Sequence, residues 1–279
     1  MWHLLGLKAA LLSQDIPLAQ QLAHKLAAPS WRKQADAANT SLLNNMGLLF
    51  RRLKVYAFAM EAYQCSLDYE QKNRAVVLHN MAVVARKSGD LQKALTLLKQ
   101  ARELMTKPEH IAAYYNNVAN IYSDLGDSDK ALEAFHQAFL RHGMTRNVRG
   151  QVRTGLNAVE TLISTRDWNG FARYFPVVDN AVSQLDNKGY SAMWVWQQAV
   201  VKSLQGHVLS DEEVNELMSL LPHLSMQMRR VRKYAALMSL HVSFLQTPGI
   251  PPLDADKGYA LWQTLKAVWC QKAPVESAA

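Results

Sequence analysis

The chain has 279 residues, of which 49% are hydrophobic and 19% are charged, so it can bury an extended core and is not a disordered polyelectrolyte. Basic residues exceed acidic ones by eight, and residues 1–147 hold most of the excess, with 18 basic and 12 acidic side chains. This imbalance favours an acidic partner, and no apolar stretch approaches the roughly 18–20 residues that a membrane-spanning helix needs.

Helix-forming residues dominate, and runs of alternating β-branched residues are absent, so the sequence predicts an all-α fold. A first helix pair is expected over residues 3–28, with its turn at Asp15-Ile16-Pro17. Because this pair begins so close to residue 1, we expect the chain to be part of a longer protein. Further pairs are predicted at 40–70, 75–107, 112–142, 148–186 and 190–222. A long helix over 225–246 and a last helix over 254–271 complete the expected order.

Small residues recur at two fixed positions of the predicted pairs. In the second helices, Ala59, Ala94 and Ala131 lie 35 and 37 residues apart. In the first helices, Gly47, Ala82 and Ala119 show the same intervals. Small side chains at such positions let two helix backbones approach closely, and a larger residue there would overpack the crossing. A period of about 34 residues with two helices per unit is the signature of tetratricopeptide repeats.

The chain therefore resembles the tetratricopeptide repeat family, most clearly over residues 40–142. The resemblance implies a right-handed superhelix of about seven antiparallel helix pairs, of which the last three are degenerate. We expect one continuous solenoid, with a regular array over 1–145 and degenerate repeats plus a C-terminal capping helix over 146–279. In this family the first helices line a concave groove.

The first helices carry asparagine at a fixed point. The pattern of two asparagines, an aliphatic and a small residue resembles the peptide-binding repeats of kinesin light chains and bacterial signalling regulators, in which such asparagines hold the backbone of an extended peptide. A carboxamide both donates and accepts, so it can pair with any main chain. The candidate amide column is Asn45, Asn80 and Asn117, preceded by Asn44, His79 and Asn116 and followed by Asn120. The alternative is that these asparagines bond the neighbouring repeat.

Basic residues follow the asparagines in the first two of these repeats. They are Arg51, Arg52, Arg86 and Lys87, whereas the third repeat has Ser123-Asp124 at this point. If the concave face includes them, it selects carboxylates; otherwise they are the solvated ends of amphipathic helices. We therefore expect a non-enzymatic scaffold that binds a protein or peptide segment, of acidic character, in its groove. By analogy with the family, the chain is a module of a larger bacterial signalling regulator.

Two other functions stay open. Arg229, Arg230, Arg232 and Lys233 form the densest basic cluster, which could contact nucleic acid phosphates, although no nucleic-acid-binding motif accompanies it. The degenerate C-terminal pairs, which contain several tryptophans, could instead form a homodimer surface.

No pattern in the chain indicates catalysis. Phosphate-binding loops, dinucleotide-binding glycine patterns, nucleophile elbows and paired metal-binding histidines are all missing, so we expect neither an enzyme, nor a cofactor, nor a metal site. Cys65 and Cys270 lie far apart and fit no metal or redox spacing. We expect them to be buried, reduced thiols, which fits a cytoplasmic protein.

Overall fold

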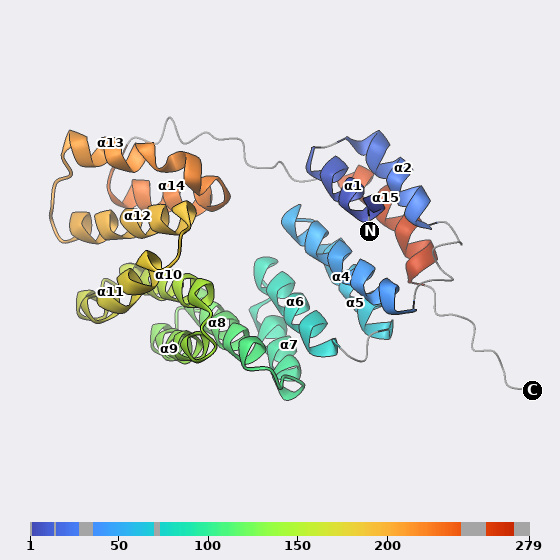
Figure 1. Ribbon diagram of the computed structural model, residues 1–279, viewed down its shortest axis with the longest axis horizontal. Coiled ribbons are helices and arrows are strands. Elements are labelled where there is room, and N and C mark those ends of the chain that lie inside the picture. The colour runs from blue at the N-terminus through green and yellow to red at the C-terminus, as the bar shows by residue number, and fades with distance from the viewer. Residues whose placement is uncertain (1, 14, 28–35, 70–72, 241–254, 271–279) are drawn as a thin grey trace, which may run out of the picture. The chain divides into compact units, whose positions relative to one another are not determined.

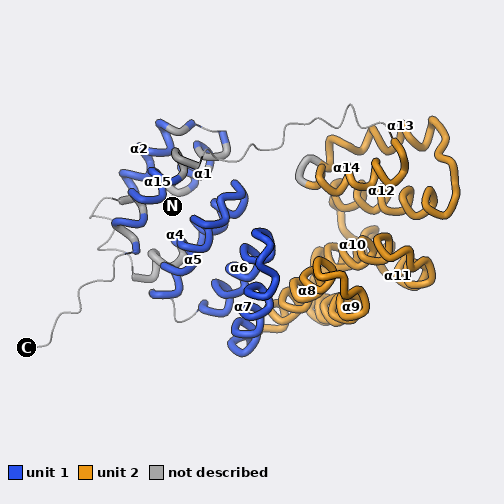
Figure 2. Tube along the Cα trace, turned by 180° about the vertical axis from the view of Figure 1, so that it is seen from behind, with its two compact units in different colours: residues 1–105, 250–279 blue, residues 106–249 orange. Residues whose placement is uncertain are grey.

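The computed structural model describes residues 2–13, 15–27, 36–69, 73–240 and 255–270. Within these ranges the chain forms fourteen α-helices and one 3₁₀ helix, and it forms no β-strand (Figure 1). Helices that follow one another in the chain pack against one another, as in a helical repeat array, so the predicted all-α class is confirmed. The helices divide into two compact units, coloured separately in Figure 2.

Unit 1 comprises residues 1–105 and 250–279. Its helices are α1 (Trp2–Leu12), α2 (Ile16–Ala27), α4 (Asp36–Arg52), α5 (Tyr56–Tyr69), α6 (Arg74–Lys87), α7 (Leu91–Glu103) and α15 (Ala255–Trp269). The pairs α1–α2, α4–α5 and α6–α7 are the predicted hairpins, and α5 also packs against α6. The last helix, α15, packs on α2 and α5, far from its place in the sequence.

Unit 2 comprises residues 106–249. Its helices are α8 (Pro108–Asp124), α9 (Ser128–Met144), α10 (Val148–Thr165), α11 (Trp168–Ser183), α12 (Lys188–Leu204), α13 (Asp211–Ser219), η1 (Leu221–Gln227) and α14 (Met228–Leu237). A buried glutamine joins three of them, since Gln197 Nε2 of α12 donates to the Leu156 carbonyl of α10 and to the Tyr234 hydroxyl of α14, at 2.8 and 2.9 Å. This amide fixes α14 against the repeat helices.

Four of the turns between helices share one construction. Gly89 and Gly126 adopt positive φ angles of 92° and 81°, which glycine tolerates because it has no Cβ. The next residue in each turn, Asp90 or Asp127, accepts a hydrogen bond from the backbone N–H three residues later and so caps the following helix. Two later turns in unit 2 follow the same scheme, with arginine at the positive-φ position: Arg146 and Asn147, then Arg166 and Asp167.

The small residues lie at the helix crossings, as predicted. The second-helix alanines are fully buried, and their first-helix counterparts are buried too; the set is Ala59, Ala94, Ala131, Gly47, Ala82 and Ala119. A Cβ added at Gly47 would overlap the ring of Tyr63, which is itself fully buried. Gly47 therefore allows α4 and α5 to cross closely around an aromatic ring.

Two sequence predictions are wrong. The helix expected over 225–246 is divided, because the 3₁₀ segment η1 ends at Gln227 and α14 ends at Leu237, while residues 241–246 fall outside the described ranges. The cysteines are not free thiols. Cys65 and Cys270 form a disulfide, with their Cα atoms 5.3 Å apart. A separation of 205 residues gave no local pattern from which this bond could be predicted.

Among the described helices, none is both long enough and apolar enough to cross a membrane. The disulfide leaves the compartment open, so the cytoplasmic location stays a prediction. The continuous solenoid and its division near residue 145 also stay predictions.

Candidate protein-binding surface

In unit 1, the candidate asparagines lie on the neighbouring first helices α4 and α6. Asn80 Nδ2 donates to Asn44 Oδ1 at 3.0 Å, so the two carboxamides bridge the helices. Both side chains are half-buried, and Asn45 beside them is exposed. His79, which precedes Asn80 on α6, is also half-buried. Asn80 thus bonds the neighbouring repeat through Asn44, which is the structural alternative that the sequence left open. Partner binding by the column of Asn45, Asn80 and Asn117 stays a prediction.

The basic candidates lie in the last turns of the same two helices. Arg51 and Arg52 end α4, and Arg86 and Lys87 end α6. Arg52 and Lys87 are exposed, whereas the two other side chains are half-buried. Cations at a helix C-terminus interact favourably with the helix dipole, so these residues stabilise the helix ends and also present positive charge. We call the surface formed by the described side chains of α4 and α6, from Asn44–Asn45 and His79–Asn80 to these four basic residues, the α4–α6 surface.

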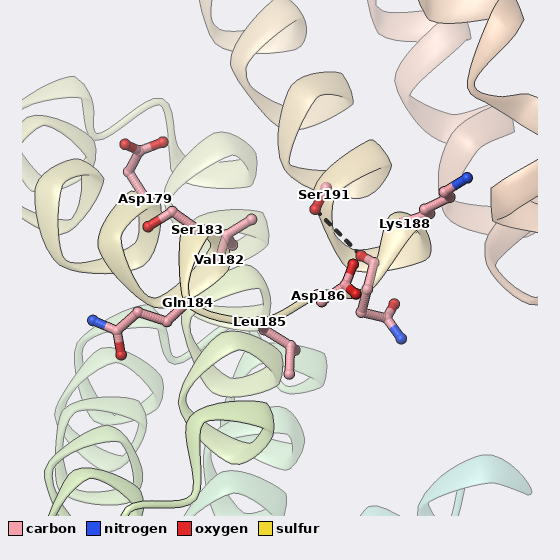
Figure 3. A pocket seen from close by; sticks show the side chains of 9 residues that line it. Asp179, Val182, Ser183, Gln184, Leu185, Asp186, Lys188 and Ser191 are labelled. Carbon is pink, nitrogen blue, oxygen red and sulfur yellow. Dashed lines mark hydrogen bonds between the residues drawn. The ribbon is translucent and has the colours of Figure 1, made fainter.

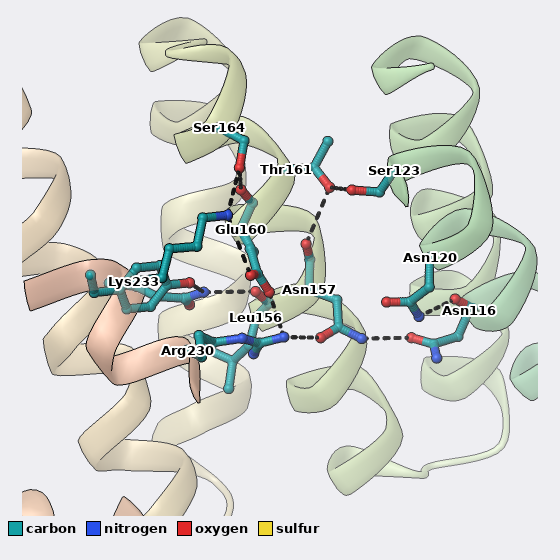
Figure 4. Close-up of polar contacts among 12 residues, drawn as sticks. Asn116, Asn120, Ser123, Leu156, Asn157, Glu160, Thr161, Ser164, Arg230 and Lys233 are labelled. Atoms are coloured by element: carbon teal, nitrogen blue, oxygen red, sulfur yellow. Dashed lines mark hydrogen bonds and ion pairs between the residues drawn. The ribbon is translucent and has the colours of Figure 1, made fainter. Parts of the chain in front are cut away.

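In unit 2, the candidate asparagines of α8 have different environments (Figure 4). Asn116 is 5% exposed, and its Oδ1 accepts from Thr154 Oγ1 and Asn157 Nδ2 of α10, at 3.2 and 3.4 Å. Asn120 Nδ2 donates to the Asn116 carbonyl one helical turn earlier. Asn117 is half-buried. Asn116 therefore bonds the neighbouring repeat, which is the structural alternative that the sequence left open.

Polar side chains also connect α10 to α14, and the sequence did not predict these contacts. Asn157 Oδ1 accepts from Arg230 Nη2 at 3.0 Å, and the same guanidinium pairs with Glu160. Lys233 lies 3.7 Å from Glu160 and donates to Ser164 at 3.2 Å (Figure 4). Two members of the basic cluster considered for nucleic acid binding are thus ion-paired within unit 2. No sequence signal indicated that α14 would lie against α10.

An open hollow of about 440 Å³ lies where α11 is followed by α12 (Figure 3). Its polar groups make local contacts: Asp179 Oδ1 accepts from the Trp194 indole at 2.8 Å, and Ser191 Oγ donates to the Asn187 carbonyl. Asp186 and Lys188 at its rim are exposed. The hollow therefore lacks a nucleophile held against a base. Across the described parts of the chain, no group of three or more metal-binding side chains is found.

The central part of the chain matches a known protein family. Residues 73–139 match the tetratricopeptide repeat family. The matched residues cover α6, α7, α8 and most of α9, including the Gly89-Asp90 and Gly126-Asp127 turns. A search of curated proteins finds no match to the chain. A tetratricopeptide repeat is in general a protein-interaction module and is typically non-catalytic.

Proposed function

We propose that this protein is a non-enzymatic scaffold that binds an extended, acidic segment of a partner protein on the α4–α6 surface. The observation that carries the proposal is the Asn44–Asn80 hydrogen bond, which aligns the amides of two neighbouring first helices beside the basic helix ends.

The amides would hold the main chain of the bound segment. A carboxamide has two N–H donors and an oxygen with two lone pairs, so one mutual hydrogen bond does not exhaust the capacity of either Asn44 or Asn80. Asn45, which is exposed on the same helix as Asn44, adds a further amide. This mode of binding is independent of the side chains of the bound segment, so it would select an extended backbone rather than a particular sequence.

The basic residues would select acidic side chains. Arg52 and Lys87 are exposed at the ends of α4 and α6, with Arg51 and Arg86 beside them. Arginine offers a planar fork that matches a carboxylate. Positive charge also steers an acidic partner toward the surface, an effect that salt weakens.

Asn117 and Asn120 of unit 2 lie outside the α4–α6 surface, and their contact with a partner is a separate part of the hypothesis. Asn116 is given a supporting role, because its buried oxygen holds Thr154 and Asn157. Membership of a signalling regulator, like the kinesin-light-chain subtype, rests on the sequence resemblance alone and is part of the hypothesis.

A peptide-display selection tests the choice of partner. The immobilised full chain is exposed to a library of random peptides, and the bound sequences are counted. We expect enrichment of aspartate and glutamate, which is lost when Arg52 and Lys87 are both changed to glutamate. The matched control is Lys93→Glu with Lys99→Glu, because these lysines are exposed on the second helix α7. Selection of neutral or basic peptides, or an equal loss in the control, would contradict the proposal.

A further inference from the structure

The seam between α5 and α15 brings together residues about 200 positions apart in the chain. On α15, Leu261 and Trp262 are buried, with 2% and 0% exposure. The Trp262 ring meets the buried Phe50 ring edge-on, with centroids 5.5 Å apart. Tyr259 lies one turn earlier against Phe58, at 6.1 Å. The apolar side of α15 therefore completes an aromatic cluster of α4 and α5 in unit 1.

A carboxylate of α5 holds the same helix by two charged or polar contacts. Glu61 Oε2 accepts from Trp262 Nε1 at 2.8 Å and from Lys266 Nζ at 2.7 Å. Partial burial pushes the pKa of Glu61 upward, but the hydrogen bonds from Lys266 and Trp262, with the lysine charge, outweigh it and leave the pKa below its ordinary value. Glu61 is therefore ionised at neutral pH and anchors α15 through both partners.

The disulfide is the next contact along this seam. Cys65 follows Glu61 by one helical turn, and Cys270 follows Lys266 by one turn. The pairs Phe58–Tyr259, Glu61–Trp262 and Cys65–Cys270 thus succeed one another in the same direction on α5 and α15. Aromatic, ionic and covalent contacts form one seam. The disulfide extends an existing helix contact and does not join two otherwise separate segments.

The rest of unit 1 depends on this seam as well. Among the described residues, α2 packs more extensively on α15 than on α4 or α5. The side chains that α2 buries include Ala19, Ala23 and Leu26. α15 therefore lies against both the first helix pair and the second, and its departure would uncover apolar surface on each.

We propose that the Cys65–Cys270 disulfide is a redox-controlled latch that determines whether α15 can leave α2 and α5. With the bond intact, α15 cannot separate from α5 at this end. With the bond reduced, only noncovalent contacts oppose separation, namely the packing of α15 on α2 and the Trp262, Tyr259 and Glu61 contacts with α4 and α5. α15 can then open independently of the rest of unit 1. The opened state presents the aromatic face of α4 and α5, which α15 of the same chain otherwise occupies.

The redox step uses a dithiol reductant. Cys270 is half-buried and Cys65 is 8% exposed, so a reductant thiolate attacks Cys270 Sγ. The disulfide breaks, and Cys65 leaves with the electron pair as a thiolate that takes up a proton. The second reductant thiol then attacks the mixed disulfide and releases Cys270 as a thiol. The protein gains two electrons and two protons, and the reductant becomes a disulfide.

Hydrogen exchange of the full chain, followed by mass spectrometry, tests the latch. Dithiothreitol should accelerate exchange of residues 255–269 at least tenfold and leave α10 unchanged. The Cys65→Ser/Cys270→Ser variant should exchange at the fast rate with or without the reductant. When both cysteines are reduced, the Glu61→Gln variant should exchange residues 255–269 faster than the wild type does, because the ionic contact then limits the opening of α15.

Three results would overturn the proposal. The first is equal exchange of α15 in oxidised and reduced wild-type protein. The second is alkylation of both cysteines in protein that was purified under oxidising conditions and then unfolded without reductant. The third is a disulfide-linked dimer on a non-reducing gel, which would show that the bond joins two chains.

Discussion

The contacts that stabilise unit 1 internally differ in kind from those inside unit 2. Unit 2 is built from helices that lie close to one another in the chain, and the buried Gln197 amide is a polar link between α10, α12 and α14. Unit 1 contains two such hairpins of regular design, but its first hairpin packs mainly on α15, a helix from the other end of the chain. Sequence-local packing can be predicted from a repeat interval, whereas closure by a distant helix cannot.

The largest expected effect comes from removing the tryptophan at the seam. Trp262→Ala deletes a fully buried side chain and the hydrogen bond to Glu61, so it should destabilise unit 1 by about 3–5 kcal/mol. Hydrogen exchange should show the loss in α2 and α5 but not in α10. Tyr259→Ala is the control, because that side chain is 55% exposed and should cost much less. Equal destabilisation of both units would contradict the separation between them.

A pH dependence should mark unit 2. His142 is buried, and within the described ranges neither ring nitrogen has a hydrogen-bond partner. Burial, assisted by the charge of Arg153, lowers its pKa from 6.5 to about 4. Between pH 4 and pH 6.5 the unfolded chain binds more protons at His142 than the folded chain does. The contribution of neutral His142 to the free energy of unfolding is therefore complete above pH 6.5, and it is lost as the pH drops toward 4.

The expected loss from His142 is about 3 kcal/mol, at 1.36 kcal/mol per pKa unit. Urea titrations at pH 7 and pH 4.5, followed by hydrogen exchange of α9 and α10, measure it. His142→Leu has no ionisable group, so its stability should depend less on pH than that of the wild type. An identical pH dependence in both proteins would show that His142 is not responsible.

A smaller effect is expected inside the α4–α5 hairpin. Gly47→Ala forces a methyl group against the Tyr63 ring and should cost about 1–3 kcal/mol. Tyr63→Phe should be neutral or slightly stabilising, because the buried hydroxyl has no hydrogen-bond partner among the described residues. Thermal melts of the two variants check this pair. A Tyr63→Phe variant that loses as much stability as Gly47→Ala would reveal a partner for the hydroxyl.

The smallest change in stability is expected from loss of the hydrogen bond between Asn80 and Asn44. Asn44→Ala and Asn80→Ala should each cost about 0.5–1.5 kcal/mol, because one side chain–side chain hydrogen bond is lost in a half-buried setting. A double-mutant cycle should give a coupling of similar size. Additive losses, with no coupling, would mean that the bridge does not form in solution.

The features predicted from the sequence are those that depend on near neighbours. Gly89 and Asp90 make a turn by themselves, and the interval from Asn44 to Asn80 places both on adjacent helices. The features that were not predicted depend on distant partners. Nothing near Cys65 or Glu61 indicates that residues 262–270 would pack against α5. The positive φ angles of Arg146 and Arg166 were also not predicted, because glycine is the residue that adopts this conformation in the earlier repeats.

The affinity of one peptide for two proteins tests the proposed function most directly. A labelled acidic peptide from the display selection is titrated with the wild-type chain and with the Asn45→Ala/Asn80→Ala variant, whose melting is checked first. Because the amides are proposed to hold the peptide backbone, we expect the variant to bind at least tenfold more weakly while it stays folded. Unchanged affinity in the folded variant would contradict the account.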